Sequence, residues 1–105
     1  MKLNVLERLV VSSLLPEQGS FLNLKLIREA KEDLSFNEEE HKVLEFKSNN
    51  GAINWNASAN IIKDIQLGEV VRGLIENALK DLDKQEKIEE RHFSLYQKFV
   101  LKEDN

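Results

Sequence analysis

Apolar side chains recur at the spacing of an α-helix in four stretches of the chain, residues 4–15, 21–34, 69–82 and 89–101. Positions three and four apart lie on one side of a helix, so each stretch is expected to bury one face. A shorter helix is expected from residue 38 to about residue 43. The expected buried positions are Val5, Leu6, Leu9, Val10, Ser13 and Leu14 in the first helix, Phe21, Leu24, Ile27, Ala30 and Leu34 in the second, Val71, Leu74, Ile75, Ala78, Leu79 and Leu82 in the long one, and His92, Leu95, Tyr96, Phe99 and Val100 in the last.

Residues that favour helix starts stand at the beginning of three of these helices. Asn4 and Asn37 each precede a glutamate by three positions, Glu7 and Glu40, which is the spacing of a capping box. Ser20 is expected to cap the second helix, since a serine hydroxyl accepts a hydrogen bond from a free backbone N–H. The helix starts are therefore predicted at residues 4, 20 and 37.

Between the third and fourth helices the apolar residues alternate with period two, which is typical of strands. Two alternating runs flank Asn50-Gly51, the strongest short signal for a two-residue hairpin, because both turn positions need a positive φ. The apolar side of the hairpin is expected to pack on the helices, and residues 63–67 are expected to add a third strand. The expected pairs are Phe46 with Trp55, Lys47 with Asn54, and Ser48 with Ile53. The fold class is α+β, about five helices with a small antiparallel hairpin or three-stranded sheet.

Composition narrows the class of protein. The chain has 105 residues, which predicts one domain spanning residues 1–105. Charged residues make up 32% and the formal net charge is −4, so a basic nucleic-acid-coating protein is not expected. The chain contains no cysteine, which excludes disulfides and thiol catalysis. No apolar run approaches the ~20 residues of a membrane span. No secretory signal is recognisable either, because Glu7 and Arg8 interrupt the first apolar run. A cytoplasmic protein is expected.

Both histidines follow a glutamate by three residues, in the pairs Glu38/His41 and Glu89/His92. Two Glu-x-x-His pairs with two further glutamates form the di-metal site of carboxylate-bridged helical bundles. The alternative, two histidines without a ligand role, is favoured because the first pair lies in an acidic run and the hairpin shortens any bundle. No serine elbow and no phosphate-binding glycine loop is present. We therefore predict no catalytic residue, no cofactor and no metal ligand.

The order of helix, helix, short helix and hairpin over residues 4–56 resembles a winged helix-turn-helix domain. That resemblance implies that the third helix reads the major groove and the hairpin acts as the wing. The third helix, however, begins with Glu38, Glu39 and Glu40, which would face phosphates. A DNA-binding regulator is therefore the alternative function, and binding to nucleic acid is not expected.

Four segments of the chain resemble small bacteriophage- and prophage-encoded proteins of uncharacterised function. These segments are residues 5–8 (VLER), 15–19 (LPEQG), 36–41 (FNEEEH) and 92–100 (HFSLYQKFV). The resemblance implies a short accessory protein of a mobile element and brings no catalytic residues with it.

The last helix carries more large apolar side chains than one buried face requires. They are Phe93, Leu95, Tyr96, Phe99, Val100 and Leu101. Their excess is expected to be covered by the long helix from Glu69, by a second copy of the chain or by an unidentified protein, and a two-fold homodimer is the commonest solution. Trp55 is either a surface anchor or the cross-strand partner of Phe46, and the second reading is favoured. The candidate interaction surface is Trp55, Phe93, Tyr96, Phe99 and Val100, and the predicted function is a non-enzymatic protein–protein interaction module.

Overall fold

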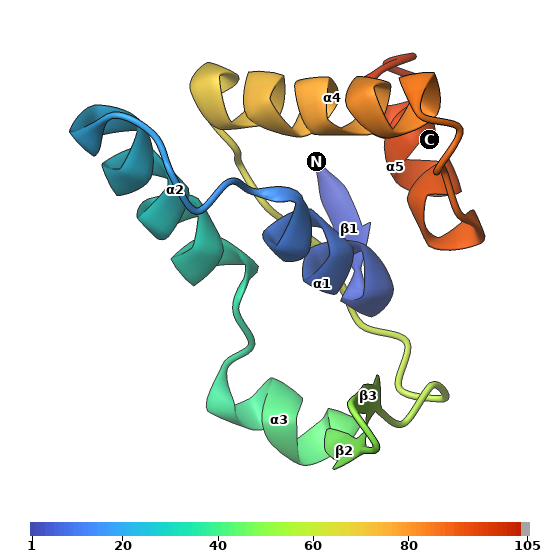
Figure 1. The fold of residues 1–105 in the computed structure, drawn as a ribbon. Coiled ribbons are helices and arrows are strands. Elements are labelled where there is room, and N and C mark those ends of the chain that lie inside the picture. The colour runs from blue at the N-terminus through green and yellow to red at the C-terminus, as the bar shows by residue number, and fades with distance from the viewer. Residues whose placement is uncertain (104–105) are drawn as a thin grey trace.

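The computed structural model describes residues 1–103, which form five helices and two separate two-stranded antiparallel sheets (Figure 1). The predicted α+β class is confirmed. The elements in chain order are β1 (Lys2–Asn4), α1 (Val5–Leu14), α2 (Phe21–Leu34), α3 (Glu38–Leu44), β2 (Lys47–Asn49), β3 (Ala52–Asn54), β4 (Ile62–Asp64), α4 (Glu69–Lys84) and α5 (Glu90–Phe99). Within these residues no helix combines the length and the apolar character that a bilayer crossing requires.

Helices α1, α2, α4 and α5 form one part of the molecule, which we call the body. Helix α1 lies in its centre and contacts each of the other three, while α4 runs across the top in Figure 1. The predicted caps of α1, α2 and α3 are confirmed, with capping boxes at Asn4 and Asn37. The core contains Leu3, Val10, Val11, Leu15, Ile27, Ala30, Leu34, Ile65, Val71, Ile75, Leu79, Leu95 and Phe99.

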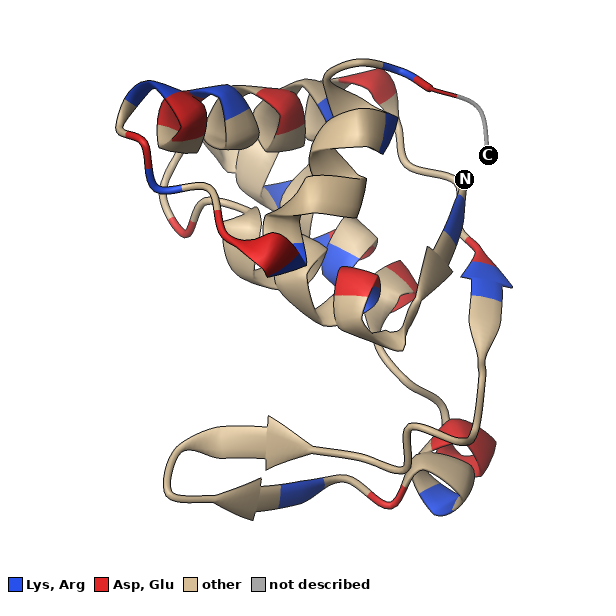
Figure 2. Ribbon diagram, turned by 90° about the vertical axis from the view of Figure 1, so that its right-hand side faces the viewer, with Lys and Arg blue, Asp and Glu red and all other residues tan. Residues whose placement is uncertain are grey.

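Helix α3 and the β2–β3 hairpin form a second part, the arm, which lies below the body in Figures 1 and 2. The predicted register is confirmed, because Lys47 pairs with Asn54 and Ser48 with Ile53. The predicted packing on the helices is wrong. Every residue of β2 and β3 is exposed, because the short hairpin turns away from the body. The hairpin is therefore a surface feature and no part of the core.

The third strand is present, but its predicted partner is wrong. Strand β4 pairs with β1 at the start of the chain, with Leu3 opposite Lys63, and makes no pair with the hairpin. Strand β1 is three residues long, too short for its alternation to be visible in the sequence. This pairing brings the first residues of the chain against the segment that leads into α4.

Three predicted buried positions are exposed instead. Phe21 in the first turn of α2 is 85% exposed, and Leu6 and Ser13 in α1 also face solvent. Helix α1 buries Glu7, Arg8 and Val11 in their place. A helix in the centre of the body is surrounded on more than one side, so it buries charged residues that a single apolar stripe assigns to solvent.

Gly73 lies inside α4, where glycine costs about 1 kcal/mol relative to alanine and therefore predicts close packing or a break. The helix continues through it, and a Cβ at this position would meet no atom within 4 Å. We therefore expect Gly73→Ala to raise the free energy of unfolding by about 0.5–1 kcal/mol, measured by urea denaturation. An unchanged or lower free energy of unfolding would show that Gly73 is required by a contact that the single chain does not contain.

Candidate interaction surface

Arg8 joins the body to the arm and is fully buried. Its Nη1 donates to Glu40 Oε2 at 2.6 Å, and its Nη2 donates to Glu40 Oε1 at 3.3 Å. The Nε and Nη2 atoms also donate to the backbone oxygens of Leu34 and Ser35, while the guanidinium lies 3.9 Å from the ring centroid of Phe36. The hydrogen bond from Arg8 lowers the pKa of the Glu40 carboxyl, against the opposing effect of burial. The charges of Arg8 and Glu40 therefore stabilise the contact between the body and the arm.

Glu7 forms a second buried network, which joins α1 to α5. Its carboxylate accepts hydrogen bonds from the Asn4 backbone N–H at 2.9 Å and from Ser94 Oγ at 2.8 Å. The Lys98 ammonium lies 2.8 Å from Glu7 Oε2 and also donates to the Lys2 backbone oxygen. All the buried side-chain nitrogen and oxygen atoms of the described residues have a hydrogen-bond partner. The buried charges thus hold separate elements of the fold together.

Both histidines have structural roles. His92 is buried, and its Nδ1 accepts the backbone N–H of Glu89 at 3.0 Å, which caps the start of α5. His41 packs edge-on against Phe46 with ring centroids 5.5 Å apart. Within residues 1–103, no three His, Cys, Asp or Glu side chains gather as a metal site would require.

Burial lowers the pKa of His92, and the positive charge of Arg91 lowers it further, while Glu89 acts in the opposite direction. The unfolded chain therefore binds a proton near pH 6.5 that the folded chain still excludes. We expect the free energy of unfolding to fall as the pH is lowered from about 7.5 through 6.5. Urea denaturation at a series of pH values measures this slope, which His92→Gln should reduce.

The outer side of α5 carries an exposed apolar patch. Phe93 is 58% exposed and Leu101, just after the helix, is 57% exposed. Together with Ile88, Tyr96 and the polar side chains of Asp83 and Gln97 they line a hollow of about 220 Å³. The Tyr96 hydroxyl donates to Asp83 Oδ2 at 3.1 Å, which links α5 to the end of α4 and fixes the ring at the edge of the hollow. We call the residues Ile88, Phe93, Tyr96 and Leu101 the α5 patch.

The structure separates the predicted surface residues. Phe93 and Tyr96 lie together in the α5 patch, whereas Phe99 is 3% exposed and belongs to the core, so it does not reach a partner. Val100 is half-buried and packs against the core. Trp55 lies in the arm, half-buried, with its ring centroid 6.2 Å from that of Phe46, as expected of a cross-strand partner. Leu101 and Ile88 complete the surface. No periodic pattern in the sequence indicates a role for Ile88, because it lies in the loop between α4 and α5.

Helix α3 is the one that a winged-helix interpretation would place in the major groove. Glu38 and Glu39 at its start are exposed, and Glu40 is held by Arg8. Figure 2 shows the acidic side of this helix at the base of the arm. DNA binding through α3 stays a prediction of the alternative function, and the carboxylates at its start oppose it.

Comparison with known proteins gives no relative: the chain matches no protein-family model, no curated protein and no solved structure.

Proposed function

We propose that this chain is a non-enzymatic protein–protein interaction module that pairs with a second copy of itself through the α5 patch. The observation that carries the proposal is the exposure of Phe93 and Leu101 on either side of an apolar hollow. An exposed aromatic side chain beside a pocket of matching size is a common anchor at protein interfaces. In a two-fold pair, Phe93 of each copy can occupy the hollow of the other.

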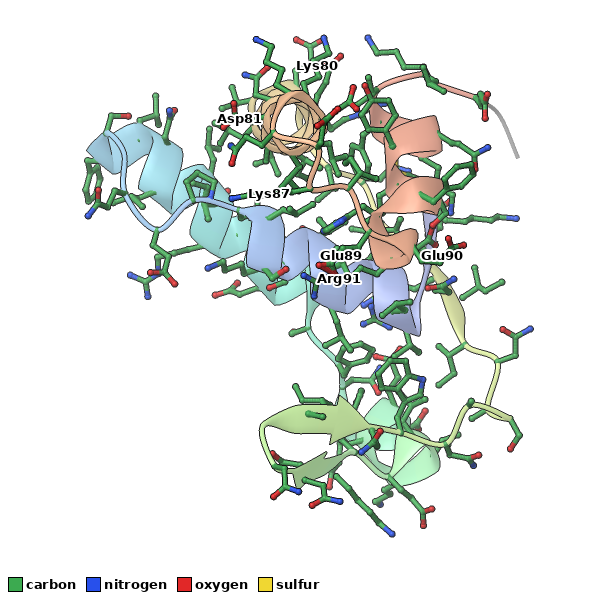
Figure 3. The ribbon with its side chains drawn as sticks, turned by 45° about the vertical axis from the view of Figure 1, so that its right-hand side comes forward. Lys80, Asp81, Lys87, Glu89, Glu90 and Arg91 are labelled. Atoms are coloured by element: carbon green, nitrogen blue, oxygen red, sulfur yellow. The ribbon has the colours of Figure 1, made fainter. Side chains whose placement is uncertain are left out.

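The charges beside the α5 patch support pairing between two copies of the chain. Figure 3 shows Lys87, Glu89, Glu90 and Arg91 around the start of α5. Arg91 pairs with Glu89 in the same chain at 2.9 Å, whereas Lys87 and Glu90 make no ion pair within residues 1–103. A surface that offers one free charge of each sign is self-complementary across a two-fold axis, because each charge meets its opposite in the other copy.

The involvement of both histidines and of the buried carboxylates in structural contacts supports a binding role over an enzymatic one. The likeness to small phage and prophage proteins supports an accessory role for such a module.

Dilution followed by NMR tests where the contact lies. We expect the amide and ring signals of Phe93, Tyr96 and Leu101 to shift as the chain is diluted from about 500 to 5 μM, because the monomer fraction of a dimer with a Kd of about 10 μM rises from about 10% to about 60% over that range. The signals of Phe21, which is also exposed but lies on α2, should stay in place. Signals that do not depend on concentration anywhere on α5 would contradict the proposal.

A further inference from the structure

A second, larger cavity lies at the C-terminal end of α5. It has a volume of about 590 Å³ and is formed by β1, β4, α4 and the residues that follow α5. In Figure 2, β1, β4 and the segment after α5 lie on the right-hand side of the molecule. Met1 and Ile62 are its apolar side chains, the other lining side chains carry a polar or charged group, and no aromatic residue contributes. The cavity therefore contains many more charged groups than the α5 patch.

Two of the carboxylates in the lining are already neutralised by cations of the same chain. Glu7 is paired with Lys98 at 2.8 Å, and Asp64 is paired with the Met1 amine at 2.7 Å. These pairs leave three cationic side chains against one carboxylate, that of Glu103. The three are Lys2, Arg72 and Lys102, and none of them donates a side-chain hydrogen bond or forms an ion pair within residues 1–103. A net positive cavity stands out in a chain whose formal net charge is −4.

The backbone after α5 holds Lys102 at the edge of this cavity. Lys102 has a φ of 56°, in the left-handed region that favours glycine. The turn after the helix is held by a hydrogen bond from the Glu103 N–H to the Gln97 oxygen at 2.9 Å, six positions back. The backbone on both sides of Lys102 is therefore anchored to α5, and its side chain lines the cavity.

We propose that this cavity binds a small phosphate-bearing anion, held by Lys2, Arg72 and Lys102. Lys2 in β1, Arg72 in α4 and Lys102 after α5 line the cavity from three parts of the chain, and each can offer such an anion charge-assisted hydrogen bonds. The absence of aromatic side chains from the lining leaves nothing for a nucleobase to stack on, so recognition rests on charge. The exposed Ile62 offers contact for a short aliphatic portion of the ligand.

Titration with inorganic pyrophosphate tests the site, with ionic strength held constant by sodium chloride and the protein followed by NMR. We expect saturable shifts of the Lys2, Arg72 and Lys102 amides with a Kd below about 1 mM. Arg72→Gln and Lys102→Gln should each weaken binding by about fivefold, as expected for the loss of one charge near the surface. Arg28→Gln on α2 removes the same kind of exposed charge outside the cavity and should leave binding unchanged.

Three outcomes would overturn the proposal. Shifts that stay linear up to about 10 mM pyrophosphate would show screening rather than a site. Equal weakening by Arg28→Gln would show that no particular cation is involved. Displacement of pyrophosphate by short duplex DNA at lower concentration, lost in Arg72→Gln, would assign the cavity to a nucleic-acid backbone. Circular dichroism of each variant establishes that the fold is intact.

Discussion

Replacement of Arg8 by methionine is expected to lower the free energy of unfolding by about 3–5 kcal/mol, the range for removal of one partner from a buried ion pair. Methionine fills a similar volume but leaves the backbone oxygens of Leu34 and Ser35 without the donors from Arg8, and leaves Glu40 with only the Asn37 N–H as a donor within residues 1–103. It also removes the cation that lies over the Phe36 ring. Since a small domain has only about 5–15 kcal/mol in total, this single change is expected to bring the chain close to unfolding. Urea denaturation measures it.

Two further variants separate the network from a general effect of arginine. Arg28→Met removes an exposed arginine from α2 and should change the free energy of unfolding by no more than about 0.5 kcal/mol. The double variant Arg8→Met/Glu40→Gln should be more stable than Arg8→Met, because no unpaired carboxylate remains. Equal effects of Arg8→Met and Arg28→Met would contradict the description of Arg8 as the link between body and arm.

Replacement of Glu7 by alanine is expected to cost about 2–3 kcal/mol. The change removes the acceptor for the Asn4 N–H, the Ser94 hydroxyl and the Lys98 ammonium, and so loosens both the start of α1 and its contact with α5. Thermal and urea denaturation measure the loss. Glu17→Ala, in the exposed turn before α2, is the matched control and should have little effect.

A double-mutant cycle with Lys98→Met tests whether the pair acts as a unit. The two single changes and the double change should give a coupling free energy of about 0.5–3 kcal/mol, as is typical of residues in one network. Additive effects would show that Glu7 acts through the helix cap alone.

Local signals in the sequence predicted the helices, their caps and the hairpin register. Asn4 with Glu7 and Asn37 with Glu40 form the capping boxes that their spacing indicates, and Asn50 and Gly51 both adopt a positive φ. These features depend on residues within a few positions of one another, so the chain sequence contains the necessary information.

Tertiary features escaped prediction for identifiable reasons. The partner of β4 is β1, about 60 residues away, and β1 is too short to show a period. The sequence pattern left Arg8 and Glu7 outside the expected buried face of the first helix. Their partners, Glu40 and Lys98, lie 32 and 91 positions further along the chain. A buried charge becomes visible in a sequence only once the partner that compensates it is known.

The predicted interaction surface is also divided in the structure, with one part in the core and another in the α5 patch. Phe93 and Phe99 are six positions apart, which places their side chains about 120° apart around the helix, so they point to different sides of it. The structure places Phe99 in the core and Phe93 in the α5 patch, where Ile88 joins it from the preceding loop. The helical period alone separates the two phenylalanines, whereas the contribution of Ile88 depends on how the loop folds.

Sedimentation equilibrium of the unmodified chain and of two phenylalanine variants tests the proposed pairing most directly. At about 100 μM the unmodified chain should have twice its monomer mass of 12.2 kDa. Phe93→Ser should return the mass to that of the monomer, and Phe21→Ser, which removes the most exposed phenylalanine from α2, should remain a dimer. A mass of 12.2 kDa for the unmodified chain, or dissociation by Phe21→Ser but not by Phe93→Ser, would contradict self-association through the α5 patch.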